Sequence, residues 1–224
     1  MQHLKLIIFD LDGTLLNTLP DLAHSANFAL VKSGFPTHPV EDYKLFIGNG
    51  ITKLLERILP ENQITETVVT QIKDSFLAYY DTHNTVYTEP YAGIPELLHS
   101  LLSKGLMMAV ASNKYQKATE KLVKLFFPDI PFIAVLGQRE GIPAKPNPAI
   151  VFDILDVTGL TPCEALYVGD SGVDMETASN SGLISIGVTW GFRPRGELET
   201  TGACYIADMP DDIIEIINNQ ILPS

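Results

Sequence analysis

The chain has 224 residues and an apolar content of 46%, enough for one large domain or for a domain that carries an insertion. Its net charge of −12 argues against a general nucleic-acid binder, because a phosphate backbone requires a basic protein face. The two cysteines, Cys163 and Cys204, form no CxxC pair, which is typical of a reducing compartment. Since the sequence shows no signal-peptide pattern and no membrane-spanning apolar run, we expect a cytoplasmic protein without membrane or nucleic-acid partners.

A helical segment follows the first predicted strand, which covers residues 4–9. Pro20 stands where a first-turn proline is favoured, and an amphipathic pattern covers residues 64–82. Gly48-Asn49-Gly50 interrupts the helices, and we find no convincing strand in this segment. We therefore expect an inserted, all-helical cap domain. The predicted division is a core of residues 1–14 and 89–224 and a cap of residues 15–88.

Four further apolar runs predict strands after this insertion. All the runs are near-continuous, as expected when helices cover both faces of a parallel sheet. Helical patterns at 94–104 and 175–181 lie between them, and each ends at a glycine. The later strands are predicted at residues 106–111, 132–136, 165–168 and 184–188. The alternation predicts an α/β fold with a doubly wound, mostly parallel sheet, a Rossmann-like core.

Polar residues gather at four points where the predicted sheet would bind a ligand. In open α/β sheets ligands bind at the carboxyl ends of the strands, near the point where the strand order reverses. The four groups are Asp10-Leu11-Asp12-Gly13-Thr14, Ser112-Asn113-Lys114, Lys145 in the loop "AKPNP", and Gly169-Asp170-Ser171-Gly172-Val173-Asp174.

Each group has an ordinary alternative when it is taken by itself. The first suits a strand-ending turn, Ser112-Asn113 suits a helix N-cap, and Lys145 suits a solvated surface. A calcium loop is disfavoured because Leu15 stands where that loop needs glycine. A serine nucleophile at Ser171 is disfavoured because Val173 stands where G-x-S-x-G needs glycine.

Together the four groups indicate phosphoryl transfer. Acids gathered at one sheet edge repel each other unless a cation lies among them, and carboxylate oxygens suit magnesium. A phosphoryl group adds negative charge, which Mg²⁺, Lys145, Ser112 and the backbone amides after Asp10 could neutralise. That assembly is what a phosphoryl-transfer site contains.

The ordered motifs "DLDGT", "SN", "KPNP" and "GDSGVDM" resemble those of the haloacid-dehalogenase-like hydrolase superfamily, across essentially the whole chain. The helical insertion after the first motif resembles the cap that this family carries there. The stretches "YKLFIGNG", "EPYAGI", "GQREGIPAKPNP" and "GVTWGFRPRGEL" look most like its phosphoglycolate phosphatase branch. The resemblance implies a magnesium-dependent phosphatase of a small phosphorylated metabolite, with 2-phosphoglycolate as the expected substrate. We expect a monomer or a homodimer.

The resemblance also implies a role for each motif residue. Asp10 is the expected nucleophile, which forms an aspartyl-phosphate, and Asp12 the expected general acid and base. Asp10 and Asp170 are expected to hold Mg²⁺ by their side chains and Asp12 by its backbone carbonyl, with Asp174 supporting from close by. The expected substrate-binding residues are Gly13, Thr14, Ser112, Asn113 and Lys145 in the core and Gly48 and Gly50 in the cap.

Several alternatives stay open. The acid at Asp12 disfavours a dehalogenase, and a phosphonate-cleaving enzyme would need a cap lysine such as Lys44 or Lys53. A phosphatase of a sugar phosphate or of pyrophosphate is possible, as is a sugar phosphomutase, which uses the same two aspartates. A non-catalytic phospho-ligand-binding module on the same fold is the alternative outside the enzymes.

Overall fold

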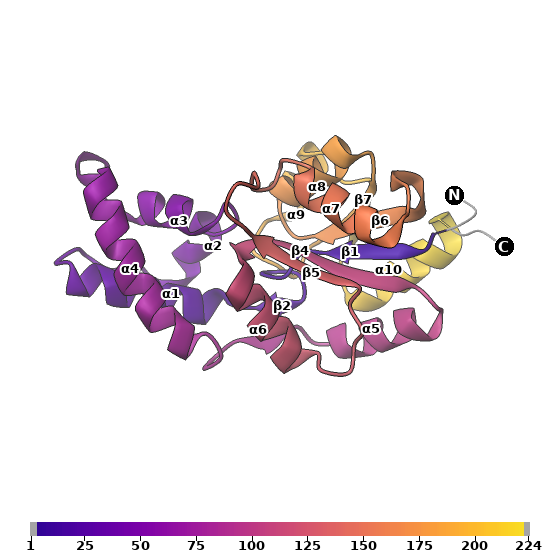
Figure 1. Cartoon of the computed structure of the whole chain (residues 1–224), viewed down its shortest axis with the longest axis horizontal. Helices are drawn as coiled ribbons and strands as arrows, with labels where there is room; N and C mark the ends of the chain where they lie inside the picture. The colour runs from indigo at the N-terminus through magenta and orange to yellow at the C-terminus, as the bar shows by residue number, and fades with distance from the viewer. Residues whose placement is uncertain (1–3, 222–224) are drawn as a thin grey trace.

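The computed structural model describes residues 4–221, which form a six-stranded sheet with a helical lobe at one end (Figure 1). The strand order is β5-β4-β1-β6-β7-β8, and every neighbouring pair is parallel. The strands are β1 (Leu6–Phe9), β4 (Met107–Tyr115), β5 (Ala134–Gln138), β6 (Ala165–Gly169), β7 (Ile184–Val188) and β8 (Tyr205–Ala207). The expected α/β fold with a doubly wound, parallel sheet is confirmed.

Helices cover both faces of this sheet, as β1 shows residue by residue. Leu6 and Ile8 pack in one apolar layer, Ile7 and Phe9 pack in the other, and all four are fully buried. The first layer lies under α7 (Ala149–Thr158) and α8 (Gly172–Ser181). The second lies under α5 (Ile94–Ser103), α6 (Gln116–Phe126) and α10 (Pro210–Ile216), on the opposite side in Figure 1. This burial on both faces explains why the strand sequences are continuously apolar.

Shorter elements complete the chain. Helix α9 (Arg195–Thr200) precedes β8, and a π-helical turn (Ile217–Ile221) follows α10. Three 3-10 turns cover Val40–Asp42, Glu61–Gln63 and Pro162–Glu164. Among residues 4–221, no helix combines the length and the apolar character that crossing a membrane requires.

The helical lobe consists of four helices around an apolar cluster of their own. They are α1 (Leu19–Lys32), α2 (Tyr43–Phe46), α3 (Ile51–Ile58) and α4 (Glu66–His83). Tyr43, Ile72 and Phe76 are fully buried in this cluster, which also takes in Ala118 and Phe192 from the sheet side. We call residues 15–88 the cap from here on, and its boundaries as a domain stay a prediction.

One sequence prediction needs correction, one strand was missed, and one ordinary alternative is excluded. The cap is not all-helical, because β2 (Leu16–Asn17) pairs antiparallel with β3 (Glu89–Pro90), and a two-residue strand leaves no periodicity to detect. Strand β8 was missed because it is a three-residue edge strand that pairs on one side. Ser112 and Asn113 are not a helix N-cap, because β4 continues to Tyr115 and α6 begins at Gln116.

One buried carboxylate joins the entry of the cap to its exit. Asp21 lies in the first turn of α1 and is 2% exposed. Its oxygens accept hydrogen bonds from the Tyr87 amide at 3.1 Å, the Thr88 amide at 2.9 Å and the Thr88 hydroxyl at 2.7 Å. The two ends of the cap, far apart in sequence, are therefore held together by one charged acceptor.

We expect Asp21→Ala to lower the free energy of unfolding by about 2–3 kcal/mol, because the buried Thr88 amide and hydroxyl lose a charged acceptor. Urea unfolding followed by circular dichroism measures this change. Asp74→Ala, an exposed position on α4, is the control and should change stability by less than about 0.5 kcal/mol. Equal changes in the free energy of unfolding for the two substitutions would show that the Asp21 hydrogen bonds do not stabilise the fold.

Candidate active site

Three strands at the middle of the sheet end at the same edge, facing the cap (Figure 1). β1 lies between β4 and β6, so the chain passes to one side of β1 and later to the other. Asp10 follows β1, Ser112 lies near the end of β4, and Asp170 follows β6. This is the crevice at the reversal of strand order where open α/β sheets bind ligands.

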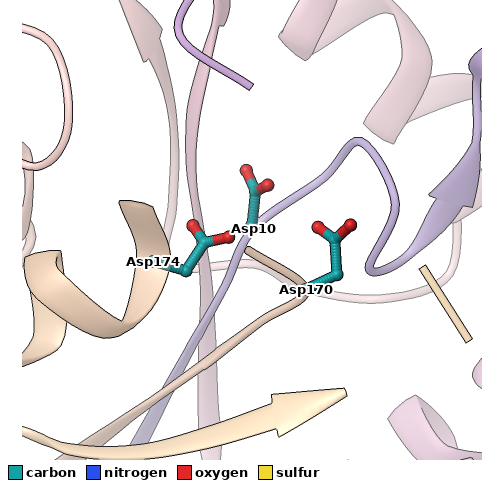
Figure 2. Close-up of side chains that lie close together, drawn as sticks. All are labelled: Asp10, Asp170 and Asp174. Carbon is teal, nitrogen blue, oxygen red and sulfur yellow. The ribbon is translucent and has the colours of Figure 1, made fainter. Parts of the chain in front are cut away.

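Three buried carboxylates converge in that crevice. Asp10, Asp170 and Asp174 can each offer one oxygen such that all three oxygens lie within 4.8 Å of one another. Figure 2 shows Asp10 and Asp170 pointing the same way, with the Asp174 carboxylate, on α8, turned toward Asp10. Burial raises the pKa of Asp10 to about 7, against the lowering effect of Lys145. Burial and the neighbouring carboxylates also raise the pKa of Asp170 well above its usual value.

These three acids fit a divalent cation. Their oxygens are the hard ligands that such ions prefer, and their mutual repulsion in a buried site is relieved when a positive charge lies among them. The surrounding backbone makes room for the carboxylates. A Cβ at Gly13, whose φ is 86°, would lie 2.3 Å from Asp170 Oδ2, so glycine is required there.

The carboxylate of Asp170 is oriented by groups from two other segments. The Phe192 amide donates to Oδ2 at 2.7 Å, and the Thr14 hydroxyl donates to Oδ1 at 3.3 Å. Thr14 therefore supports Asp170 in this structure, and the phosphate-binding role expected for Gly13 and Thr14 stays a prediction.

The oxygens of Asp174 are engaged by donors from the protein. They accept hydrogen bonds from Lys145 Nζ at 2.7 Å, Ser171 Oγ at 2.6 Å and the Ser171 amide at 3.1 Å. Ser171 is the N-cap residue of α8, and its hydroxyl is used as a donor to Asp174. Both observations agree with a supporting role for Asp174 and argue against Ser171 as a nucleophile.

Lys145 is the cation of the crevice, not a solvated surface lysine. Its side chain is 2% exposed, and its Nζ lies 2.9 Å from Asp10 Oδ1 as well as bonding to Asp174. It also donates to the Ala111 carbonyl at 2.9 Å and the Tyr167 hydroxyl at 2.9 Å. Burial by itself would lower the pKa of Lys145, but Asp10 and Asp174 together raise it well above its usual value. Lys145 therefore stays charged.

Asn113 connects the core to the cap. Its side-chain nitrogen donates to the Gly48 carbonyl at 3.0 Å and the Lys145 carbonyl at 3.1 Å, and its oxygen accepts from the Lys145 amide at 2.8 Å. The amide group thus holds the cap loop and the Lys145 loop in place. Its expected direct contact with substrate stays a prediction.

Asp12 is paired with a lysine to which the sequence had assigned no role. Lys114 Nζ lies 2.9 Å from one Asp12 oxygen and 3.0 Å from the other, and the Thr18 hydroxyl donates to Asp12 at 2.7 Å. The Lys114 side chain is 3% exposed. The sequence signal for Lys114 was its place beside Ser112 and Asn113 at the end of β4.

A cavity lined by residues of both parts lies between this crevice and the cap. Polar and charged side chains from the core face it, while most of its wall on the cap side is apolar. Its core lining includes Asp10, Asp12, Ser112, Asn113, Lys114, Asp170, Ser171, Phe192 and Arg193. Its cap lining comprises Leu22, Ile47, Gly48, Gly50, Ile51, Leu54, Phe76 and Tyr80.

The loop Gly48-Asn49-Gly50 borders the cavity at the cap side. Gly48 and Gly50 have φ values of 119° and 83°, which non-glycine residues rarely adopt. Arg193 donates a hydrogen bond to the main-chain carbonyl of Ile47 at 2.8 Å and another to that of Lys44. Arg193 was missed as a positioning residue, although it lies within "GVTWGFRPRGEL".

The cap lysines do not reach the cavity lining. Lys44 pairs with Glu41 at 2.8 Å and Lys53 with Glu56 at 2.6 Å, all on exposed or half-exposed positions. Neither lysine belongs to the cavity wall among residues 4–221. This placement gives no support to a lysine Schiff base and agrees with the simpler interpretation of exposed helix lysines.

Comparison with known proteins agrees with this geometry. A model of haloacid dehalogenase-like hydrolases matches residues 7–188. The chain belongs to that family. A phosphoglycolate phosphatase of Mannheimia succiniciproducens is 33% identical over 222 residues, covering 96% of this chain and 99% of the relative. A phosphoglycolate phosphatase of Haemophilus influenzae is 36% identical over 219 residues, covering 95% and 98%.

Solved structures extend the likeness to the whole fold. A structure from Lactobacillus delbrueckii subsp. bulgaricus matches with a TM-score of 0.92 at 34% identity, covering 98% of this chain and 100% of that one. The family resemblance expected from the sequence is confirmed. The expected enzyme class is confirmed as well: the chain is a phosphatase, a phosphoric monoester hydrolase of this family.

The raised pKa of Asp10 predicts a pH-dependent cost in stability when no metal is bound. The folded value of about 7 lies above the ordinary 3.8, so the stability that this group contributes at low pH is lost as pH rises through 7. In chelator, we expect the melting temperature of Asp10→Asn to exceed that of the wild type, by a difference that grows between pH 5 and pH 8. Thermal unfolding at both pH values measures it.

Two further outcomes belong to this experiment. A divalent cation should raise the melting temperature of the wild type more at pH 8 than at pH 5, because binding displaces protons from the cluster. The same cation should raise that of Asp10→Asn by much less. A difference that shrinks with rising pH would contradict the assignment of the raised pKa to Asp10.

Proposed function

We propose that this chain is a magnesium-dependent phosphatase that hydrolyses 2-phosphoglycolate to glycolate and phosphate through an aspartyl-phosphate intermediate. The observation that carries the proposal is the buried cluster of Asp10, Asp170 and Asp174 beside Lys145, under a cavity covered by the cap. The relatives named phosphoglycolate phosphatase, which match nearly the whole chain, support the choice of substrate.

Asp10 and Asp170 would hold Mg²⁺ by their side chains and Asp12 would hold it by its backbone carbonyl, at the buried cluster of acids. Asp174 has its oxygens on Lys145 and Ser171 and supports the others from close by. When bound, the ion supplies positive charge to the carboxylates and to the phosphoryl oxygens that enter among them.

The chain's own residues carry the reaction in two steps. The Asp10 carboxylate forms a bond to phosphorus as the bond from phosphorus to the glycolate oxygen breaks, and Asp12 gives that oxygen a proton. Asp12 then takes a proton from water as the water attacks the phosphorus, which releases phosphate and restores Asp10. Ser112 and Lys145 hold the phosphoryl oxygens through both steps.

The cavity wall favours a small leaving group over a sugar. Leu54, Phe76 and Phe192 would leave the hydroxyl groups of a sugar without hydrogen-bond partners, which costs free energy in a buried site. The closed cap would also shield the intermediate from bulk water, leaving room for the single water that completes turnover. The alternatives are a phosphatase that acts on a sugar phosphate or on pyrophosphate, and a sugar phosphomutase.

We expect Asp10→Asn to abolish turnover of 2-phosphoglycolate, because an amide does not attack phosphorus. Asp12→Asn should lower kcat by about 10²–10⁴-fold, since it removes proton transfer but keeps the nucleophile. Phosphate release by the purified variants measures both effects. The aspartyl-phosphate mechanism fails if Asp10→Asn keeps substantial activity while Ser171→Ala loses it.

Chelation should remove activity and added Mg²⁺ should restore it. Ca²⁺ should inhibit, because it takes more ligands at longer distances and would displace the attacking carboxylate. Rates measured in chelator, and then with each ion in excess, test this expectation. Full activity in excess chelator would contradict a metal-dependent mechanism.

A further inference from the structure

Two residues of the cavity wall carry a polar group that has no part in the proposed reaction. The first is the hydroxyl of Tyr80, on α4 of the cap, which is fully buried and has no hydrogen-bond partner among residues 4–221. The second is the ammonium of Lys114, on β4 of the core, which lies 5.0 Å from the centre of the Tyr80 ring. Both residues line the cavity.

The Tyr80 hydroxyl is a donor without an acceptor. Burial raises the pKa of Tyr80 well above its usual value, and the charges of Asp12 and Asp21 raise it further, so the proton is retained. A buried hydroxyl without a partner costs stability and is uncommon in folded proteins. Its place on the wall of a substrate cavity indicates that the missing partner is a group of the ligand.

Lys114 is the cation in the cavity wall that keeps bonding capacity for a ligand. Two of its three N–H bonds are directed at the Asp12 oxygens, and the structure gives the third no acceptor among residues 4–221. The other cation of the wall, Arg193, is committed to the carbonyls of cap residues and lies 3.4 Å from Glu197.

The chemistry of the substrate places its carboxylate next to Asp12. In 2-phosphoglycolate a single methylene separates the carboxylate from the oxygen that leaves phosphorus. The group that protonates this oxygen therefore lies close to the group that binds the carboxylate. Lys114 Nζ is 2.9 and 3.0 Å from the two oxygens of Asp12, which satisfies this requirement.

We propose that Lys114 and Tyr80 form the subsite for the substrate carboxylate, with Lys114 pairing its charge and the Tyr80 hydroxyl donating a hydrogen bond. The proposal rests on the proposed function and adds the residues that select the substrate. One member comes from the core and the other from the cap, so the subsite is complete when the cap lies over the core. Its chemistry fits a short leaving group that carries one carboxylate.

The test compares 2-phosphoglycolate with ethyl phosphate, in which a methyl group replaces the carboxylate. Selectivity is the ratio of kcat/KM for the two substrates, measured by phosphate release. We expect Tyr80→Phe to lower this ratio about tenfold, and Lys114→Met to lower it about a hundredfold, mainly through KM for 2-phosphoglycolate. The melting temperature of Tyr80→Phe should not fall, because the oxygen that it removes has no partner.

Two matched controls separate these effects from general ones. Tyr79→Phe removes a hydroxyl one residue away on α4, and Lys53→Met removes an exposed charge from α3. Both should keep the selectivity of the wild type. If circular dichroism shows that Lys114→Met does not fold, Tyr80→Phe decides the proposal by itself.

The possible failures are distinguishable. An unchanged selectivity ratio in Tyr80→Phe overturns the carboxylate subsite. An equal fall in kcat/KM for both substrates in Lys114→Met also overturns it, because Lys114 would then act on Asp12 alone. A wild-type enzyme that hydrolyses ethyl phosphate as well as 2-phosphoglycolate instead overturns the proposed substrate, before any variant is considered.

Discussion

The charge of Lys145 inside a group of buried carboxylates is the constraint on which the site depends. Its ammonium lies 2.9 Å from Asp10 and 2.7 Å from Asp174, and each of these side chains is almost wholly buried. Without that cation, the two acids would meet both desolvation and mutual repulsion. Lys145 therefore holds the end of β1 and the start of α8 together, and it fixes Asp10 at the edge of the crevice.

The second dependence is the contact between core and cap. Arg193 and Asn113 extend from the core and bind main-chain carbonyls of the cap loop, including those of Ile47 at 2.8 Å and Gly48 at 3.0 Å. Asn113 is bonded at the same time to the backbone of Lys145. One side chain therefore holds both the cap loop and the loop that carries Lys145.

Much of the site could be predicted because its chemistry is local in sequence. Asp10 and Asp12 follow a buried strand, and Gly13 and Thr14 come directly after them, so residue type and position carry the signal. Lys114 and Tyr80 could not be assigned in the same way. A lysine near the end of a strand and a tyrosine on an apolar helix face are common in proteins. Their proposed role depends on their proximity in the fold, where Lys114 Nζ lies 5.0 Å from the centre of the Tyr80 ring.

The sequence by itself determined the α/β fold, the family and the order of the four motifs, because strand burial and loop chemistry are written in short stretches. The tertiary structure alone decided what pairs at long range. β2 exists because Leu16 and Asn17 meet Pro90 and Glu89, and Asp12 is paired because β4 carries Lys114 beside β1. Such contacts join segments whose separate sequences contain no trace of the partner, and folding brings them together.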